Sequence, residues 1–240
     1  MEVINYLLGY KDLKIVQNTE YFNFSLDSVL LANFVTIRSN TNKIMDLGTG
    51  NAPIPLILST KTKAQIYGVE IQDAIYKLAL KTISINRMEE KIKLLNEDIK
   101  TIDKLFETDS FDIITSNPPY FKITGGSLVN NSNHKTIARH EVLMTIDDVL
   151  GVSRKLLKNN GILGLVHRPE RLLEILTKMK KYNIEPKRIR FVYPKVGMNC
   201  NMILIEGSKN GKEGLKIMPP LFVHDKDGKY TTEVEEMFGA

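Results

Sequence analysis

The feature that most constrains the fold is a regular alternation, from residue 43 onward, of short β-branched runs with longer helical patterns. Such alternation is typical of βαβ units, in which each helix connects two parallel strands of one sheet. The runs predict strands at 43–47, 65–70, 91–96, 111–116, 161–167, 188–193 and 200–207. Apolar residues at three- and four-residue spacing predict helices at 53–60, 72–88, 98–106, 142–158 and 169–182.

The last two predicted strands depart from this alternation. Only the segment from Pro194 to Asn199 links them, which is too short for a crossover helix, so we expect them to pair antiparallel. The sequence therefore predicts an α/β fold with a seven-stranded, mostly parallel sheet that ends in an antiparallel hairpin. We expect one domain over 1–240, with an N-terminal cap at 1–42, a core at 43–207 and a tail at 208–240.

Composition narrows the cellular setting and the chemistry. The chain has no run of eighteen apolar residues, and its start lacks the layout of a secretory signal, so we expect a cytoplasmic protein without a membrane partner. A single cysteine and four histidines without ligand spacing predict no metal site. The formal charge of +5 favours an anionic partner, and basic residues are dense between 178 and 195, although such a run can also be a solvated surface.

A tight glycine turn follows the first core strand, at residues 46–50. Gly48 and Gly50 permit positive φ and leave the backbone uncovered, so a ligand can approach it closely. A dinucleotide enzyme binds pyrophosphate at such a turn, but Asp46 would repel a pyrophosphate and the third glycine of that fingerprint is replaced by Pro53. Asp46 can instead pair with the ammonium group of S-adenosylmethionine, which we predict to be the cofactor.

Two further acids follow the next strands of the predicted sheet. Glu70 ends the second core strand, 24 residues after Asp46, and is the candidate for the ribose hydroxyls of the cofactor. Asp98 follows the third strand, where its side chain can accept the adenine amino group of the cofactor. Asp98 can equally be a helix N-cap, and both roles are compatible.

The strand at 111–116 leads into the tetrapeptide Asn117-Pro118-Pro119-Tyr120, at the sheet edge where ligands bind in this fold. The Asn117 side-chain carbonyl and the Pro118 backbone carbonyl can accept both N–H groups of a planar amino group, which turns its lone pair toward a methyl donor. The prolines stiffen the loop and donate no competing amide hydrogen. Tyr120 supplies a stacking face for a base, and Phe121 the opposite wall. A proline-stiffened structural turn is the alternative interpretation.

These residues together resemble the bacterial tRNA1(Val) (adenine-N6)-methyltransferase family over nearly the whole chain. The elements that carry the resemblance are Phe24 to Leu31, Asp46 to Gly50, Asn117 to Phe121, Ala138 to Glu141, and the tail around Pro219-Pro220-Leu221 and Tyr230-Thr231. The resemblance implies a Rossmann-like class I methyltransferase fold. It also implies a tRNA substrate, modified at the N6 of the adenosine 3′ of the anticodon of tRNA(Val).

The resemblance also implies roles for individual residues. Ser25 and Asp27 would help to close the cofactor pocket, and Arg139 and His140 would contact the RNA or the loop, although His140 can also be structural. The cofactor would be held by the set Asp46, Gly48, Gly50, Glu70, Asp98 and Asn117. In the basic stretch, Lys187, Arg188 and Arg190 are the predicted RNA contacts.

Three other functions fit parts of the pattern. A protein glutamine methyltransferase shares the Asn-Pro-Pro-Tyr loop, because a glutamine amide presents the same two N–H groups, but it carries an N-terminal helical domain for which the residues before Phe24 leave no room. DNA or rRNA amino-methyltransferases share the chemistry, and DNA enzymes usually bring a large target-recognition region that is not visible here. A non-catalytic RNA-binding module is the alternative from another class, which the complete acidic and Asn117 set disfavours.

Overall fold

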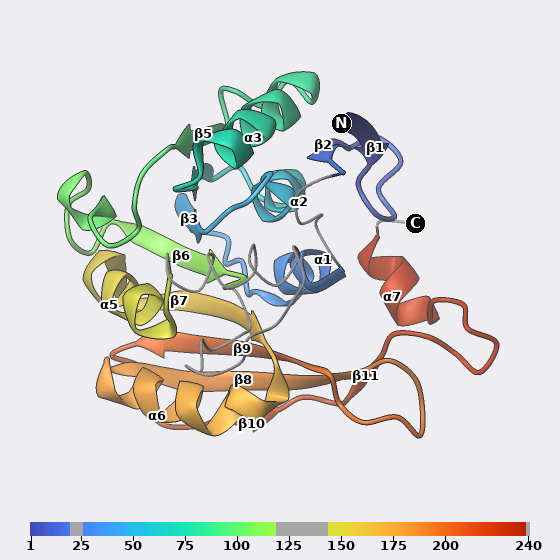
Figure 1. The fold of residues 1–240 in the computed structure, drawn as a ribbon. Helices are drawn as coiled ribbons and strands as arrows, with labels where there is room; N and C mark the ends of the chain where they lie inside the picture. Colours follow the sequence, from blue (N-terminus) through green and yellow to red (C-terminus); the bar gives the residue numbers. More distant parts are fainter. Residues whose placement is uncertain (20–25, 119–143, 239–240) are drawn as a thin grey trace, which may run out of the picture.

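The computed structural model describes residues 1–19, 26–118 and 144–238 of the chain. At its centre is a nine-stranded sheet in the order β10-β8-β9-β7-β6-β3-β4-β5, with β11 paired to β8 (Figure 1). The strands are β3 (Lys43–Leu47), β4 (Gln65–Val69), β5 (Ile92–Leu95), β6 (Phe111–Ser116), β7 (Leu157–His167), β8 (Ile184–Tyr193), β9 (Met202–Lys209), β10 (Lys216–Ile217) and β11 (Leu221–Phe222). All seven predicted strands are present, and the predicted α/β fold class is confirmed.

Strand directions follow from the lengths of the connections. β5, β4, β3, β6 and β7 are parallel neighbours, whereas β9 is antiparallel to both β7 and β8. The predicted antiparallel pair at the end of the core is therefore confirmed. β10 and β11 add two short parallel pairings to β8 that the sequence did not predict. The sheet thus places the carboxyl ends of β3, β4 and β6 side by side at one edge.

Helices cover both faces of the sheet (Figure 1). On one face lie α1 (Leu26–Phe34), α2 (Pro53–Lys61) and α3 (Asp73–Ile85), and on the other lie α5 (Ile146–Leu156) and α6 (Leu172–Lys181). Each face has its own apolar core, because alternate residues of the buried strands point to opposite sides. In β3, for example, Ile44 packs with the α1–α2 side and Met45 with the α5 side.

Local side-chain hydrogen bonds explain where one predicted helix begins and why another does not form. α5 begins at Ile146 because Thr145 and Asp148 form a capping box, in which each side chain bonds the backbone of the other residue. The predicted helix at 98–106 is wrong, since only a 3-10 turn, η1 (Ile102–Lys104), forms there. Asp98 Oδ1 accepts the N–H of Lys100 at 2.9 Å, and such a local bond competes with helix formation.

The two ends of the chain pack together beside the sheet. β1 (Glu2–Tyr6) and β2 (Lys14–Asn18) form an antiparallel hairpin, and α7 (Thr232–Met237) lies next to it (Figure 1). The Tyr10 hydroxyl donates to the Met237 carbonyl at 2.9 Å, and Phe238 is buried in the same core as the hairpin residue Leu7. The expected N-terminal cap and C-terminal tail are thus joined into one structure.

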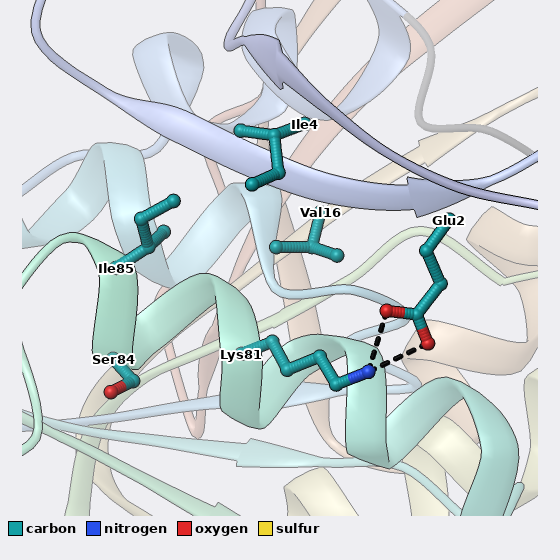
Figure 2. A pocket seen from close by; sticks show the side chains of 6 residues that line it. All are labelled: Glu2, Ile4, Val16, Lys81, Ser84 and Ile85. Carbon is teal, nitrogen blue, oxygen red and sulfur yellow. Dashed lines mark hydrogen bonds and ion pairs between the residues drawn. The ribbon is translucent and has the colours of Figure 1, made fainter.

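A groove of ≈ 550 Å³ runs between this hairpin and α3 (Figure 2). Its charged groups neutralise one another, because Lys81 Nζ lies 2.5 Å from a Glu2 carboxylate oxygen across the opening. The rest of the lining is Ile4, Val16, Ser84 and Ile85. The groove contains none of the predicted site residues, so we assign no reaction to it.

Helix length and composition also bear on membrane insertion. Within the part of the chain that the structure describes, no helix is both long enough and apolar enough to span a bilayer.

Candidate active site

The glycine turn leaves an open space above its backbone. Gly48 and Gly50 have φ of 70° and 59°, in the left-handed region that favours glycine, and Pro53 begins α2 directly afterward. Among the described residues, a Cβ atom added to Gly50 would meet no heavy atom within 4 Å, whereas one added to Gly48 would lie 2.6 Å from the Met144 side chain. The turn therefore combines a backbone conformation that glycine adopts without strain with room for a ligand against the peptide groups.

Asp46 is a buried carboxylate with one oxygen unpaired. It is 1% exposed, and its Oδ1 accepts the Thr115 hydroxyl of β6 at 2.7 Å. Its Oδ2 has no hydrogen-bond partner within the described ranges. Burial raises the pKa of Asp46 to about 7; the hydroxyls of Thr115 and Thr49 partly oppose this rise, and the nearby negative charge of Glu70 adds to it. A cation that enters this site would supply the missing partner.

Glu70 connects the end of β4 to the glycine turn. Its carboxylate accepts the backbone N–H of Gly50 at 3.0 Å and that of Gln72 at 2.9 Å. The Asn96 amide donates to the Glu70 carbonyl at 2.8 Å, which also ties the end of β5 to this edge. Glu70, the residue predicted to bind the cofactor ribose, is 5% exposed and is held directly beside the open turn.

The third predicted acid, Asp98, lies just beyond β5. Its side chain is half-buried and bonds the N–H of Lys100, so the local capping role is present. Contact with a cofactor adenine stays a prediction for this residue.

Asn117 is positioned by a hydrogen bond to α1, a helix much earlier in the sequence. Its Nδ2 donates to the hydroxyl of Ser28 on α1 at 3.3 Å, which turns the amide nitrogen toward that helix. The neighbouring strands are tied together by the Ser116 hydroxyl, which donates to the Leu47 carbonyl at 2.8 Å. Ser28 was not predicted as a site residue, although it follows Asp27 in the predicted pocket-closing segment. Asp27 itself is buried in the first turn of α1.

The start of the predicted catalytic loop is thus at the same edge as the glycine turn. Pro118 is buried directly after Asn117. Other predicted residues lie outside the described residues, namely Ser25, Pro119, Tyr120, Phe121, Arg139 and His140. Among the residues that are described, no group of three or more His, Cys, Asp or Glu side chains could hold a metal ion.

The predicted RNA-contacting basic residues of β8 are bonded within the protein. Arg188 pairs with Glu206 at 2.9 Å and donates to the Phe34 carbonyl at 2.6 Å. Arg190 pairs with Glu233 of α7 at 2.6 Å. The Lys187 ammonium donates to the Lys212 carbonyl at 2.9 Å. Both arginines therefore attach neighbouring segments to the sheet, and RNA contact by the three residues stays a prediction.

The fold and the open glycine turn define a class, and comparison with known proteins names it. A family model described as a methyltransferase domain matches residues 38–217, so the chain belongs to this family. A predicted O-methyltransferase from Agrobacterium tumefaciens has a similar fold, with a TM-score of 0.72 and 19% identity over 89% of this chain and 95% of that one. The fold is the class I methyltransferase fold, which implies use of S-adenosylmethionine.

A second solved structure supports the fold assignment. It is a geranyl diphosphate C-methyltransferase from Streptomyces coelicolor in complex with S-adenosyl-L-homocysteine, with a TM-score of 0.57 and 11% identity over 76% of each chain.

Curated relatives carry more specific names. The tRNA1(Val) (adenine(37)-N6)-methyltransferase of Histophilus somni is 27% identical over 230 residues, which cover 95% of this chain and 93% of that protein. A protein of the same name from Bacteroides thetaiotaomicron is 26% identical over 213 residues, 88% of this chain and 86% of that protein. This chain is thus similar over most of its length to proteins named for one tRNA modification.

Proposed function

We propose that this protein is an S-adenosylmethionine-dependent methyltransferase that acts on the N6 atom of adenine in tRNA. Within tRNA, the proposed target is the adenosine 3′ of the anticodon of tRNA(Val). The relatives' names support the substrate. The observation that carries the reaction is the position of Asn117, held by Ser28 at the edge where Asp46 and the open Gly50 turn also lie.

The acidic groups at this edge suit S-adenosylmethionine. The unpaired Asp46 oxygen would pair with the ammonium of its amino-acid part, and Glu70 with its ribose hydroxyls. The Gly48 and Gly50 backbone would lie against it, and Asp98 would accept its adenine amino group. Ser25 and Asp27 would close the pocket from the α1 side. When bound, the cofactor supplies a methyl group on a sulfonium, which is electrophilic.

The chain's own residues would make the adenine nitrogen reactive. The side-chain oxygen of Asn117 and the backbone carbonyl of Pro118 would accept the two N6 hydrogens. This geometry favours a pyramidal nitrogen with its lone pair directed at the methyl carbon, and orientation of this kind can lower a barrier by about 7–11 kcal/mol when it is ideal. The new bond is N6–CH3, the bond broken is S–CH3, and one N6 proton leaves to solvent. Tyr120 and Phe121 would stack on the base.

A tRNA loop suits this site better than a duplex. A base in a duplex must be extruded before its amino group reaches the site, at a cost of a few kcal/mol, roughly, per base. Anticodon-loop bases are already unpaired, and unpaired loop bases are the usual targets of sequence-specific RNA recognition. Lys187, Arg188, Arg190, Arg139 and His140 are the residues that we propose to test for RNA contact.

The test is transfer of label from S-adenosylmethionine labelled on its methyl group. The protein is incubated separately with unmodified tRNA, ribosomal RNA, DNA and a release factor, and digestion of the RNA identifies the modified nucleoside. We expect label in N6-methyladenosine of tRNA, with tRNA(Val) as the best acceptor. Label on ribosomal RNA or DNA alone would redirect the proposal to those substrates, and label on protein alone would establish a glutamine methyltransferase instead.

A further inference from the structure

The end of β8 stands above the level at which β6 ends. Pairing through β7 and β9 places Ser116 of β6, Leu165 of β7 and Ile189 of β8 at one level. β8 continues for four residues beyond that level to Tyr193, a rise of about 13 Å at the usual strand geometry. Three strand spacings, about 14 Å, separate β6 from β8. The end of β8 therefore projects past the end of β6, beside the start of the catalytic loop.

Two aromatic rings lie together at this projecting end of β8. β11 runs parallel to β8 and places Phe222 opposite Tyr193, so both side chains are on the same face of the sheet. Their ring centroids are 5.5 Å apart with an interplanar angle of 37°, and both residues are half-buried. Each ring thus keeps part of its surface open to solvent.

A second ring pair lies a few residues further along the chain. His224 stacks on Tyr230 with a centroid distance of 5.0 Å and an interplanar angle of 21°. The His224 backbone N–H donates to the carbonyl of Pro194, the residue after Tyr193, at 2.9 Å. Tyr230 in turn packs edge-on against buried Phe238 at 5.1 Å. Rings held in this way lose little conformational freedom when a partner stacks on them.

Three lysines lie close to these rings in the sequence. Lys195, Lys226 and Lys229 are exposed, and none of them has an ion-pair partner in the described part of the chain. The acid of the same turn, Asp225, accepts the backbone N–H groups of Asp227 and Lys229 with one carboxylate oxygen. The ammonium groups are therefore available to an anionic partner.

We propose that the aromatic and basic surface formed by Tyr193, Phe222 and Lys195 binds unpaired nucleotides of the RNA substrate that flank the target adenine. The inference rests on the proposed function. Unpaired RNA bases are typically recognised by stacking on aromatic side chains, while lysines neutralise their phosphates. The surface lies about 14 Å sideways from β6 and about 13 Å beyond its end, so it receives neighbouring nucleotides and not the adenine that reacts.

The test measures RNA affinity separately from chemistry. With a transcribed, unmodified anticodon stem-loop, Tyr193→Ala is expected to raise both the Kd and the KM for RNA about tenfold, as for loss of one stacked base. The kcat at saturating RNA and the affinity for S-adenosylmethionine stay unchanged, and Tyr193→Phe, which keeps the ring, behaves as wild type. Lys195→Glu is expected to weaken RNA binding about fivefold and to make its salt dependence shallower.

The matched control is Lys104→Glu, the same charge reversal at an exposed residue of η1, where the chain approaches the opposite end of β6. Because Tyr193 is half-buried, thermal unfolding of its variants is followed in parallel, while exposed Lys195 gives an independent measure. Wild-type RNA affinity in both Tyr193→Ala and Lys195→Glu would overturn the inference. So would a changed oligomeric state at unchanged RNA affinity, which would make the surface a protein interface. A wild-type protein that methylates no tRNA would instead overturn the proposed function.

Discussion

Two carboxylates are buried to a similar degree in this molecule but are held in opposite ways. Glu206 of β9 is 5% exposed, and its two oxygens accept bonds from Arg188, from the Thr36 N–H and from the Thr36 hydroxyl. Asp46 of β3 is 1% exposed and has a described bond to only one oxygen, from Thr115. A buried charge is costly unless it is paired. Glu206 is therefore fully paired within the fold, whereas Asp46 keeps the oxygen that we propose to pair with the cofactor ammonium.

The same contrast holds for the regions around the two residues. In the β8–β9 half, Arg190 pairs with Glu233, and buried Lys209 pairs with Asp109 and donates to the Leu157 carbonyl. At the glycine-turn edge, none of the described residues would meet a Cβ atom at Gly50 within 4 Å. Charged groups that pair with one another attach segments of the fold in the β8–β9 half, whereas the unpaired Asp46 oxygen belongs to the site that we propose to bind the cofactor. Four substitutions test this distinction.

The largest expected effect is on stability, at the structural carboxylate. Glu206→Ala removes the partner of half-buried Arg188 and an acceptor of two Thr36 groups, so we expect unfolding to become easier by about 3–5 kcal/mol. Urea unfolding measures this free energy. The control is Glu213→Ala, which removes an exposed carboxylate 3.6 Å from Lys180 and should cost less than about 0.5 kcal/mol. Equal losses in both variants would contradict the structural role of Glu206.

The next effect is on catalysis, at the functional edge. Asn117→Ala removes one preorganised hydrogen-bonding group, so we expect kcat to fall about 10²–10³-fold while the affinity for S-adenosylmethionine, which the other residues of the predicted cofactor set maintain, changes far less. Calorimetry gives the cofactor affinity and label transfer gives kcat. Asn159→Ala is the control, because this exposed asparagine bonds only the Asn210 side chain at the other end of the sheet. Retained turnover in Asn117→Ala would remove the proposed mechanism.

The sequence predicted the parts of the molecule that local patterns determine. β3 and β6 have the predicted bounds because each is a short apolar run that ends at a clear signal, the Gly48 turn or the Asn117-Pro118 step. Asp46 and Glu70 lie together as predicted, since the ends of parallel neighbouring strands meet at one edge. These residues needed no knowledge of distant contacts.

Features that depend on distant packing were missed. The Ser28–Asn117 bond joins residues 89 positions apart and depends on where α1 lies over the sheet. β10 and β11 are two residues long, too short for a periodic pattern, and form only because β8 offers them an edge. The internal pairing of Arg188 and Arg190 was also not visible, because a dense basic run reveals charge but not the acids that neutralise it.

Substitution of Asp46 is expected to have two effects: it should stabilise the free protein and weaken cofactor binding. Its folded-state pKa of about 7 lies above the ordinary 3.8. Its contribution to stability is therefore present below pH of about 4 and is lost as the pH rises through about 7. Asp46→Asn removes this dependence, so relative to wild type the free variant gains stability that grows from about 1.5 kcal/mol at pH 5 to about 4 kcal/mol at pH 8.

Cofactor affinity should change in the other direction. The variant loses the negative partner of the cofactor ammonium, so calorimetry at pH 8 should show binding weakened by about tenfold, a loss typical of a charged hydrogen bond. Wild-type binding should strengthen from pH 5 to pH 8, since the ionised carboxylate is the binding form. Unchanged affinity together with unchanged pH dependence would place the ammonium elsewhere.

The smallest effect is expected at Lys187, the one predicted RNA contact on β8 whose charge has no ion-pair partner in the described ranges. Its ammonium donates only to the carbonyls of Lys212 and Glu213, at 2.9 and 3.5 Å, so Lys187→Glu should change stability by less than about 0.5 kcal/mol. If Lys187 meets a phosphate, the slope of log affinity against log salt should fall in magnitude by about 0.9. Lys212→Glu, a neighbouring exposed reversal, controls for general electrostatics. Equal slopes in the two variants and wild type would mean that β8 contributes to RNA binding at its end and not along its length.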